Sequence, residues 1–163
     1  MLEVHMIEPV YDRQSKVLLL GSFPSPLSRR SGFYYGNPQN RFWQVLAAVF
    51  AVPVPVTNGE KRALLLSRGV ALWDVLASCE IDGASDTSIR NPLPNDLSLI
   101  FAAAEIRAVF TTGSAALRLY RKHIFPLNGV KAEGLPSTSP ANRGRWPFEK
   151  LVGEYAKILD FLD

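Results

Sequence analysis

Three short, mostly apolar runs stand out along the chain, at residues 16–21, 69–73 and 106–111. A shorter segment near residues 130–133 precedes a Leu-Pro pair. Short apolar runs bounded by turn residues are typical of strands that are buried on both faces, as in a parallel sheet. We therefore predict three buried strands at the apolar runs and a short fourth strand at residues 130–133.

Between the strands, apolar residues recur at helical spacing, most clearly in residues 41–51 and 147–162. Residues suited to cap or begin a helix stand at the start of each helical segment: Asn40, Thr57, Asn95, Ser114 and Pro147. Thr57 and Glu60 also have the spacing of a capping box, and Gly69 follows the predicted end of their helix.

The alternation of strands and helices predicts an α/β fold. We expect a three-layer α/β/α sandwich with a central, mainly parallel four-stranded sheet. The chain has 163 residues, the length of one compact domain, so we predict a single domain over residues 1–163. Ligands in such folds bind at the carboxyl ends of the strands, which directs attention to the loops that follow them.

Composition narrows the class of protein. Hydrophobic residues make up 47% of the chain and charged residues 20%, as in ordinary globular proteins. No apolar stretch reaches about 18 residues, and the first residues lack a signal-peptide pattern, so we expect no membrane span and no leader. The single cysteine, Cys79, excludes an intramolecular disulfide and a cysteine-held metal or Fe–S cluster. We expect no metal or other cofactor, and a cytoplasmic location.

Charge adds a mild basic excess. The net charge is +3 and the isoelectric point about 9.2, which permits nucleic-acid binding without demanding it. Arg29 and Arg30 follow the first strand, and Arg143 and Arg145 follow the fourth. These arginines would gather positive charge at one end of the sheet, where nucleic acid could lie.

The loop after the first strand, at residues 21–43, is rich in aromatic, amide and hydroxyl side chains. Loops of about 20 residues are uncommon in small domains and are usually functional. Phe33, Tyr34 and Tyr35 stand in a glycine-flanked part of it. Core packing is the favoured interpretation for large aromatic residues, and stacking on a flat ligand is the alternative.

This loop resembles the first motif of the uracil-DNA glycosylase superfamily. Its Asn-Arg-Phe-Trp ending at residues 40–43 is similar to the mismatch-specific uracil/thymine glycosylases. Its Gly-Ser-Phe-Pro-Ser opening at 21–25 and its Tyr-Tyr-Gly-Asn-Pro at 34–38 are closer to the hypoxanthine-DNA (deoxyinosine) glycosylases. The resemblance runs from about residue 17 to about residue 155 and includes Leu-Trp-Asp-Val at 72–75.

The resemblance implies a pocket for a base flipped out of the DNA helix. Ser22 and Phe23 match the place whose backbone donates to a base carbonyl, and Tyr35 matches the aromatic residue that stacks on the base. The superfamily usually has Asn or Asp where this chain has Phe23, and that residue holds the attacking water. Phenylalanine cannot orient water, so the departure argues against an ordinary uracil glycosylase and agrees with the hypoxanthine branch.

In the hypoxanthine branch, an asparagine later in the motif is implicated in catalysis. We place Asn37 first and Asn40 second as the catalytic residue. A turn residue before a proline is the structural alternative for Asn37. For Asn40 that alternative is a helix N-cap, which is the favoured interpretation of the residue.

Residues 135–145 match the superfamily's second motif, which carries the wedge that enters the duplex and part of the base pocket. Leu135 stands where relatives often have His or Asn, so a side-chain hydrogen bond to the leaving base is missing there. Ser137 and Ser139 are candidate phosphate contacts, and Asn142 and Arg143 are candidate wedge residues. A plain surface loop is the alternative for the whole segment.

Most other polar residues near the motifs are expected to have structural roles. Asp86 lies in a glycine-containing turn, and Asn95 is expected to cap a helix. Asp74, at a strand end, either shapes the pocket floor or serves structure alone. His5 falls outside the motifs, so we do not expect it to act as a catalytic base.

We therefore expect a monofunctional glycosylase that removes a deaminated base, hypoxanthine first, from damaged DNA. Water would be the nucleophile, and an abasic site the product. A uracil or G/T mismatch glycosylase is the alternative within the class. A nucleic-acid-binding module that has lost catalysis is a second alternative, and a domain that binds free nucleobases or nucleotides is a third. We expect a monomer, since no large apolar helix face is left over.

Overall fold

A computed structural model describes residues 2–162 of the chain. Its centre is a four-stranded sheet of β2 (Val17–Gly21), β3 (Val70–Asp74), β6 (Ala108–Thr112) and β7 (Ala132–Leu135). The order is β3-β2-β6-β7, and every neighbouring pair is parallel. All residues of β2 and β3 are buried, as expected for strands covered on both faces. The predicted α/β fold with a parallel four-stranded sheet is confirmed; the fourth strand lies two residues later than predicted.

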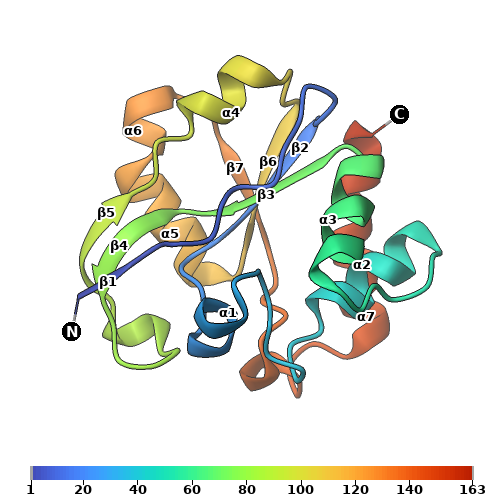
Figure 1. The fold of residues 1–163 in the computed structure, drawn as a ribbon, viewed down its shortest axis with the longest axis horizontal. Helices are drawn as coiled ribbons and strands as arrows, with labels where there is room; N and C mark the ends of the chain where they lie inside the picture. Colours follow the sequence, from blue (N-terminus) through green and yellow to red (C-terminus); the bar gives the residue numbers. More distant parts are fainter. Residues whose placement is uncertain (1, 163) are drawn as a thin grey trace.

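Helices cover both faces of this sheet (Figure 1). On one side lie α2 (Phe42–Phe50), α3 (Asn58–Ser67) and α7 (Phe148–Tyr155), which continues into the 3-10 helix η3 (Ala156–Phe161). On the other lie α5 (Ser114–His123) and α6 (Phe125–Asn128), with α4 (Ser98–Ala103) above them in the view. The short α1 (Pro26–Ser31) and the 3-10 helix η2 (Pro140–Asn142) lie together at the lower end, beyond the carboxyl ends of the strands.

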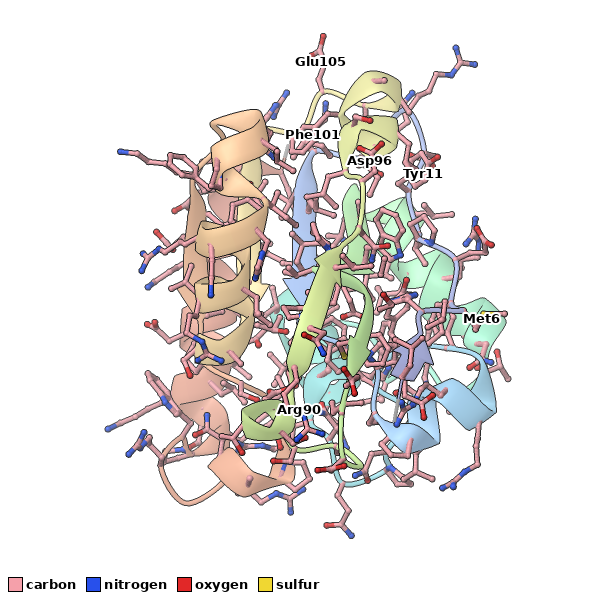
Figure 2. The ribbon with its side chains drawn as sticks, turned by 90° about the vertical axis from the view of Figure 1, so that its left-hand side faces the viewer. Met6, Tyr11, Arg90, Asp96, Phe101 and Glu105 are labelled. Atoms are coloured by element: carbon pink, nitrogen blue, oxygen red, sulfur yellow. The ribbon has the colours of Figure 1, made fainter. Side chains whose placement is uncertain are left out.

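A second sheet was not expected from the sequence. It is antiparallel and consists of β1 (Leu2–Val4), β4 (Leu76–Glu80) and β5 (Arg90–Pro94), in the order β1-β4-β5. The 3-10 helix η1 (Asp86–Ser88) lies between β4 and β5. Figure 2 looks onto this sheet, with Arg90 at the start of β5 and Met6 beyond the end of β1. Because β4 follows β3 after a single residue, the second sheet brings the N-terminal segment next to the end of β3.

The helix starts test the predicted caps. The Thr57 hydroxyl accepts from the Glu60 N–H at 3.0 Å and Glu60 accepts in return, which confirms the capping box. Asn40 accepts from the Phe42 N–H at 2.9 Å, although Arg41 is the N-cap residue of α2. Asn40 therefore caps the start of α2 from the position before the N-cap residue.

Three predicted caps were wrong in detail. The Asn95 side chain caps no helix but donates to the carbonyls of Asp74 and Leu76, at 2.9 and 3.1 Å, and so fixes the crossing from β3 to β4. Ser114 is the first residue of α5, and Pro147 is the N-cap residue of α7. Within residues 2–162, no helix is long and apolar enough to cross a membrane.

Candidate active site

A cavity of about 150 Å³ opens at the carboxyl ends of the central strands. Its walls come from the loop after β2, the ends of β3 and β6, the turn after β4 and the loop after β7. Several sequence-predicted residues line it: Ser22, Phe23, Tyr35, Asn37, Asn40, Ser137 and Ser139. Segments 100 residues apart in the chain thus meet around one space, although the roles assigned to these residues stay predictions.

Tyr35 is held in a fixed position in the cavity wall. Its ring stacks on Phe42, with centroids 3.9 Å apart and planes at 11°, and its hydroxyl lies 2.9 Å from the Thr112 Oγ1. The backbone has a φ of 54°, a left-handed conformation that is costly for a bulky residue and that tends to occur at functional sites. Burial raises the pKa of the phenol well above its ordinary value, so Tyr35 stays neutral. A base in the cavity can stack only on the ring face that Phe42 leaves free.

The two candidate asparagines differ in what their side chains already contact. The Asn40 Oδ1 accepts from the Phe42 N–H at 2.9 Å and from the Thr138 hydroxyl at 2.7 Å. The Asn37 Oδ1 accepts only from the Gln39 N–H, at 2.9 Å, and its NH₂ group makes no hydrogen bond within the described chain. Because a carbonyl oxygen has two lone pairs, Asn37 has capacity left for water, whereas the oxygen of Asn40 is saturated.

Asp74 ends β3 and forms part of the cavity floor, with only 4% of the residue exposed. The register pairs it with Gly21, and its Oδ1 lies against the α-carbon of that glycine. A Cβ at Gly21 would collide with this oxygen and lie 3.1 Å from the Tyr35 hydroxyl. Because glycine has no Cβ, the carboxylate of Asp74 and the phenol of Tyr35 can both lie close to the end of β2.

His5 lies directly behind this carboxylate. Its Nε2 is 2.9 Å from the Asp74 Oδ2, and only 2% of its side chain is exposed. His5 lies outside the sequence motifs and was not expected at the site. The pairing depends on the second sheet, which carries the N-terminal segment across the end of β3 and which no local sequence pattern predicts.

Asp86 is a second carboxylate at the cavity, near its mouth. The Ser22 hydroxyl donates to its Oδ1 at 2.8 Å. Partial desolvation raises the pKa of Asp86, and the charge of Asp74 adds to the rise, whereas the Ser22 hydrogen bond and Arg118 lower it. The turn that contains Asp86 therefore contributes a polar group to the cavity as well as a structural bend.

The raised pKa of Asp86 predicts a pH-dependent effect on stability. The folded protein holds this proton to a higher pH than the unfolded chain, so the linked stabilisation is complete below the unfolded pKa and is lost as pH rises through the folded pKa. Asp86→Asn keeps an acceptor for Ser22 and has no charge to desolvate. We expect its Tm to exceed that of the wild type by roughly 1–2 °C at neutral pH, the effect being small because the group is partly solvated. The Tm difference should vanish in melts at acidic pH; a wild type that is the more stable protein at neutral pH would contradict the account.

Hydrogen bonds tie the loop after β7 to the loop after β2, and the bond between the Thr138 hydroxyl and Asn40 is one of them. The Arg41 backbone N–H donates to the Thr138 carbonyl at 3.2 Å, and its guanidinium donates to the Trp146 carbonyl at 2.8 Å. Arg143 donates to the Gln39 carbonyl at 2.7 Å. The loop after β7 is thus held to the end of the loop after β2, which fixes the width of the cavity.

The remaining predicted DNA contacts lie around the cavity without lining it. Asn142 donates to the Ser137 carbonyl at 3.0 Å and so shapes the loop that contains it. Arg29 is engaged within the protein: it pairs with Glu3 at 3.4 Å and lies over the Phe23 ring. Arg30 is exposed on α1, which leaves it free for a phosphate.

The chain is similar in sequence and fold to known proteins. The family model of the uracil DNA glycosylase superfamily matches residues 8–163. A hypoxanthine DNA glycosylase of Methanosarcina barkeri is 31% identical over 137 residues, which cover 83% of this chain and 85% of the relative. A hypoxanthine DNA glycosylase of Methanosarcina acetivorans is 32% identical over 136 residues, covering 82% and 85%.

Among solved structures, a solution NMR structure of a Methanosarcina acetivorans protein, described provisionally as a uracil DNA glycosylase, superimposes with a TM-score of 0.79. The two sequences are 27% identical, and the match covers 98% of this chain and 99% of the other. Family model, relatives and fold agree over nearly the whole length of the protein. The chain belongs to the uracil DNA glycosylase superfamily.

Proposed function

We propose that this protein is a monofunctional DNA glycosylase that hydrolyses the N-glycosidic bond of a deaminated base, with hypoxanthine as its preferred substrate. The observation that carries the proposal is the joint presence of Tyr35, Asn37 and Asp74 in one cavity of a superfamily member. The names of the two Methanosarcina relatives support hypoxanthine as the base.

The polar groups of the cavity suit the edge of a deaminated purine. Deamination turns N1 of adenine from an acceptor into an N–H donor and replaces the amino group by a carbonyl. The backbone N–H groups of Ser22 and Phe23 have no hydrogen-bond partner within residues 2–162 and can donate to that carbonyl. The Oδ1 of Asp74 can accept from N1–H. Adenine would place a lone pair against the carboxylate and leave these groups unpaired, which is strongly unfavourable.

Asn37 supplies the group that orients the nucleophile. Bond cleavage builds positive charge on the sugar, and a water held beside the anomeric carbon completes the reaction. Asn37 lines the cavity, and its NH₂ group and second lone pair remain available to hold such a water. In this mechanism the amide replaces the Asn or Asp that the superfamily usually has where this chain has Phe23.

The product is an abasic site in an intact strand. A lyase reaction needs a nucleophilic amine in the pocket, and no lysine lines the cavity within the described chain. Lys131 precedes β7 and so lies toward the opposite end of the sheet. We further infer a monomer that acts on damaged DNA in the cytoplasm, where the free and buried Cys79 stays reduced.

The test is base release from duplexes that contain one hypoxanthine, uracil, xanthine or guanine-opposed thymine. We expect hypoxanthine to be released fastest, with strand breaks appearing only after alkaline treatment of the abasic site. Fastest release of uracil would favour the alternative suggested by the description of the Methanosarcina acetivorans structure. Binding of the duplexes with no release of any base would favour a module that has lost catalysis.

A further inference from the structure

The side chains of His5 and Asp74 are both almost completely buried. The imidazole meets Phe23 and Trp73 edge to face, with centroids 6.0 and 6.2 Å away, and Tyr34 at 6.1 Å. The His5 backbone N–H donates to the Ala77 carbonyl at 2.7 Å. Contacts to both the ring and the main chain of His5 thus hold its Nε2 toward Asp74.

The burial of the pair gives the two carboxylate oxygens of Asp74 different surroundings. The Oδ2 of Asp74 is bound by His5 at 2.9 Å, and the Oδ1 lies against the α-carbon of Gly21, at the cavity floor. Oδ1 has no hydrogen-bond partner within residues 2–162. One oxygen of Asp74 thus anchors the group, and the other is free for a ligand.

We propose that His5 is a positioning residue that makes Asp74 a fixed hydrogen-bond acceptor, so that the cavity admits bases with an N–H at this edge and rejects bases with a lone pair there. The inference rests on the proposed function, in which Asp74 contacts the base. The class admitted is that of lactam bases, of which hypoxanthine is one. Because His5 donates from Nε2 whether the ring is neutral or protonated, Oδ2 stays occupied by a donor in both states.

The surroundings explain why such an anchor is needed. The other titratable groups that face Asp74 are the phenols of Tyr34 and Tyr35 and the carboxyl of Asp86. Burial raises the pKa of both phenols well above the ordinary value, so they remain neutral. Asp86 is a second carboxyl group and offers Asp74 no opposite charge. Among these groups, only His5 forms a hydrogen bond with the carboxylate of Asp74.

The test compares His5→Leu, His5→Gln and the matched control His123→Leu, which changes the chain's other histidine. Each variant is assayed on duplexes that contain either hypoxanthine or 1-methylhypoxanthine. The methylated base keeps the carbonyl but has no N1–H to donate to Asp74. We expect His5→Leu to lower the preference for hypoxanthine between about 10- and 100-fold, the loss expected for a hydrogen bond to a charged group. The effect should appear mainly in KM, because the contact forms already in the bound state.

His5→Gln should restore most of the preference because its amide can donate to Oδ2, and His123→Leu should behave as the wild type. A structural role alone would lower the active fraction, and hence the apparent kcat, with KM and base preference unchanged. That result for His5→Leu would overturn the proposal. Absence of hypoxanthine release by the wild type would instead refute the proposed function itself.

A second measurement does not depend on folding of the variants. Imidazole ¹⁵N spectra of the wild-type protein should show a proton on the His5 Nε2 at neutral pH, and this signal should shift on binding of a duplex with a 2′-fluorinated deoxyinosine, in which the fluorine slows bond cleavage. An unprotonated Nε2, or a signal that does not respond to the duplex, would overturn the proposal.

Discussion

Replacement of Asn37 by alanine is expected to lower the single-turnover rate of hypoxanthine release by a factor of about 10² to 10³, the usual loss when a group that orients or activates the nucleophile is removed. The side chain makes one hydrogen bond within its own turn, to Gln39, so stability should change little. The measurement is release of free base under enzyme excess, with Asn58→Ala, an exposed asparagine at the start of α3, as the control.

Asn40→Ala distinguishes the two candidate residues. It removes the acceptor of both the Phe42 N–H and the Thr138 hydroxyl, so we expect a lower Tm. Release per folded molecule should fall less than in Asn37→Ala. The reverse order, with Asn40→Ala nearly inactive and Asn37→Ala close to the wild type, would assign the water to Asn40.

Gly21→Ala is expected to produce the second large effect. The new methyl group would collide with the Oδ1 of Asp74 and crowd the Tyr35 hydroxyl at 3.1 Å, so both must move. Displacement of about 1 Å at such a site can cost 10²-fold in rate, and overpacking typically costs about 1–3 kcal/mol of stability. Rate and urea unfolding should both report the change.

Gly153→Ala is the matched control for this substitution. Gly153 lies within α7, and a Cβ there would meet no atom within 4 Å. Alanine in a helix interior is favoured over glycine, so we expect a gain of roughly 0.5–1 kcal/mol with no change in rate. Equal activity of Gly21→Ala and Gly153→Ala would show that the close approach of Asp74 and Tyr35 is not needed for the reaction.

The central sheet could be predicted because three of its strands, β2, β3 and β6, are largely buried. Apolar residues run without interruption through β2, and the same pattern marks β3 and β6. The second sheet has no such pattern. Its strand β5 contains two prolines, which argue against a strand in any sequence-based interpretation, and β1 has only three residues. Pairing with β4 stabilises both strands, and this tertiary effect is not encoded locally.

The residues of the candidate site also differ in whether local sequence could predict them. Ser22, Tyr35 and Asn37 lie in one loop, so a local motif was enough to bring them together. Asp74 could have been weighted more heavily, because the ends of predicted parallel strands must meet and the register pairs it with Gly21. His5 could not be found in this way, since it reaches Asp74 from 69 residues away through the unpredicted sheet.

The most direct test of the account is a crystal structure of the protein on a duplex with one 2′-fluorinated deoxyinosine. We predict that the hypoxanthine base is turned out of the helix and lies on the free face of Tyr35. Its N1 should point toward Asp74, and the anomeric carbon of its sugar should lie toward Asn37. A base that remains stacked in the duplex, or that lies outside the cavity between the loops after β2 and β7, would contradict it.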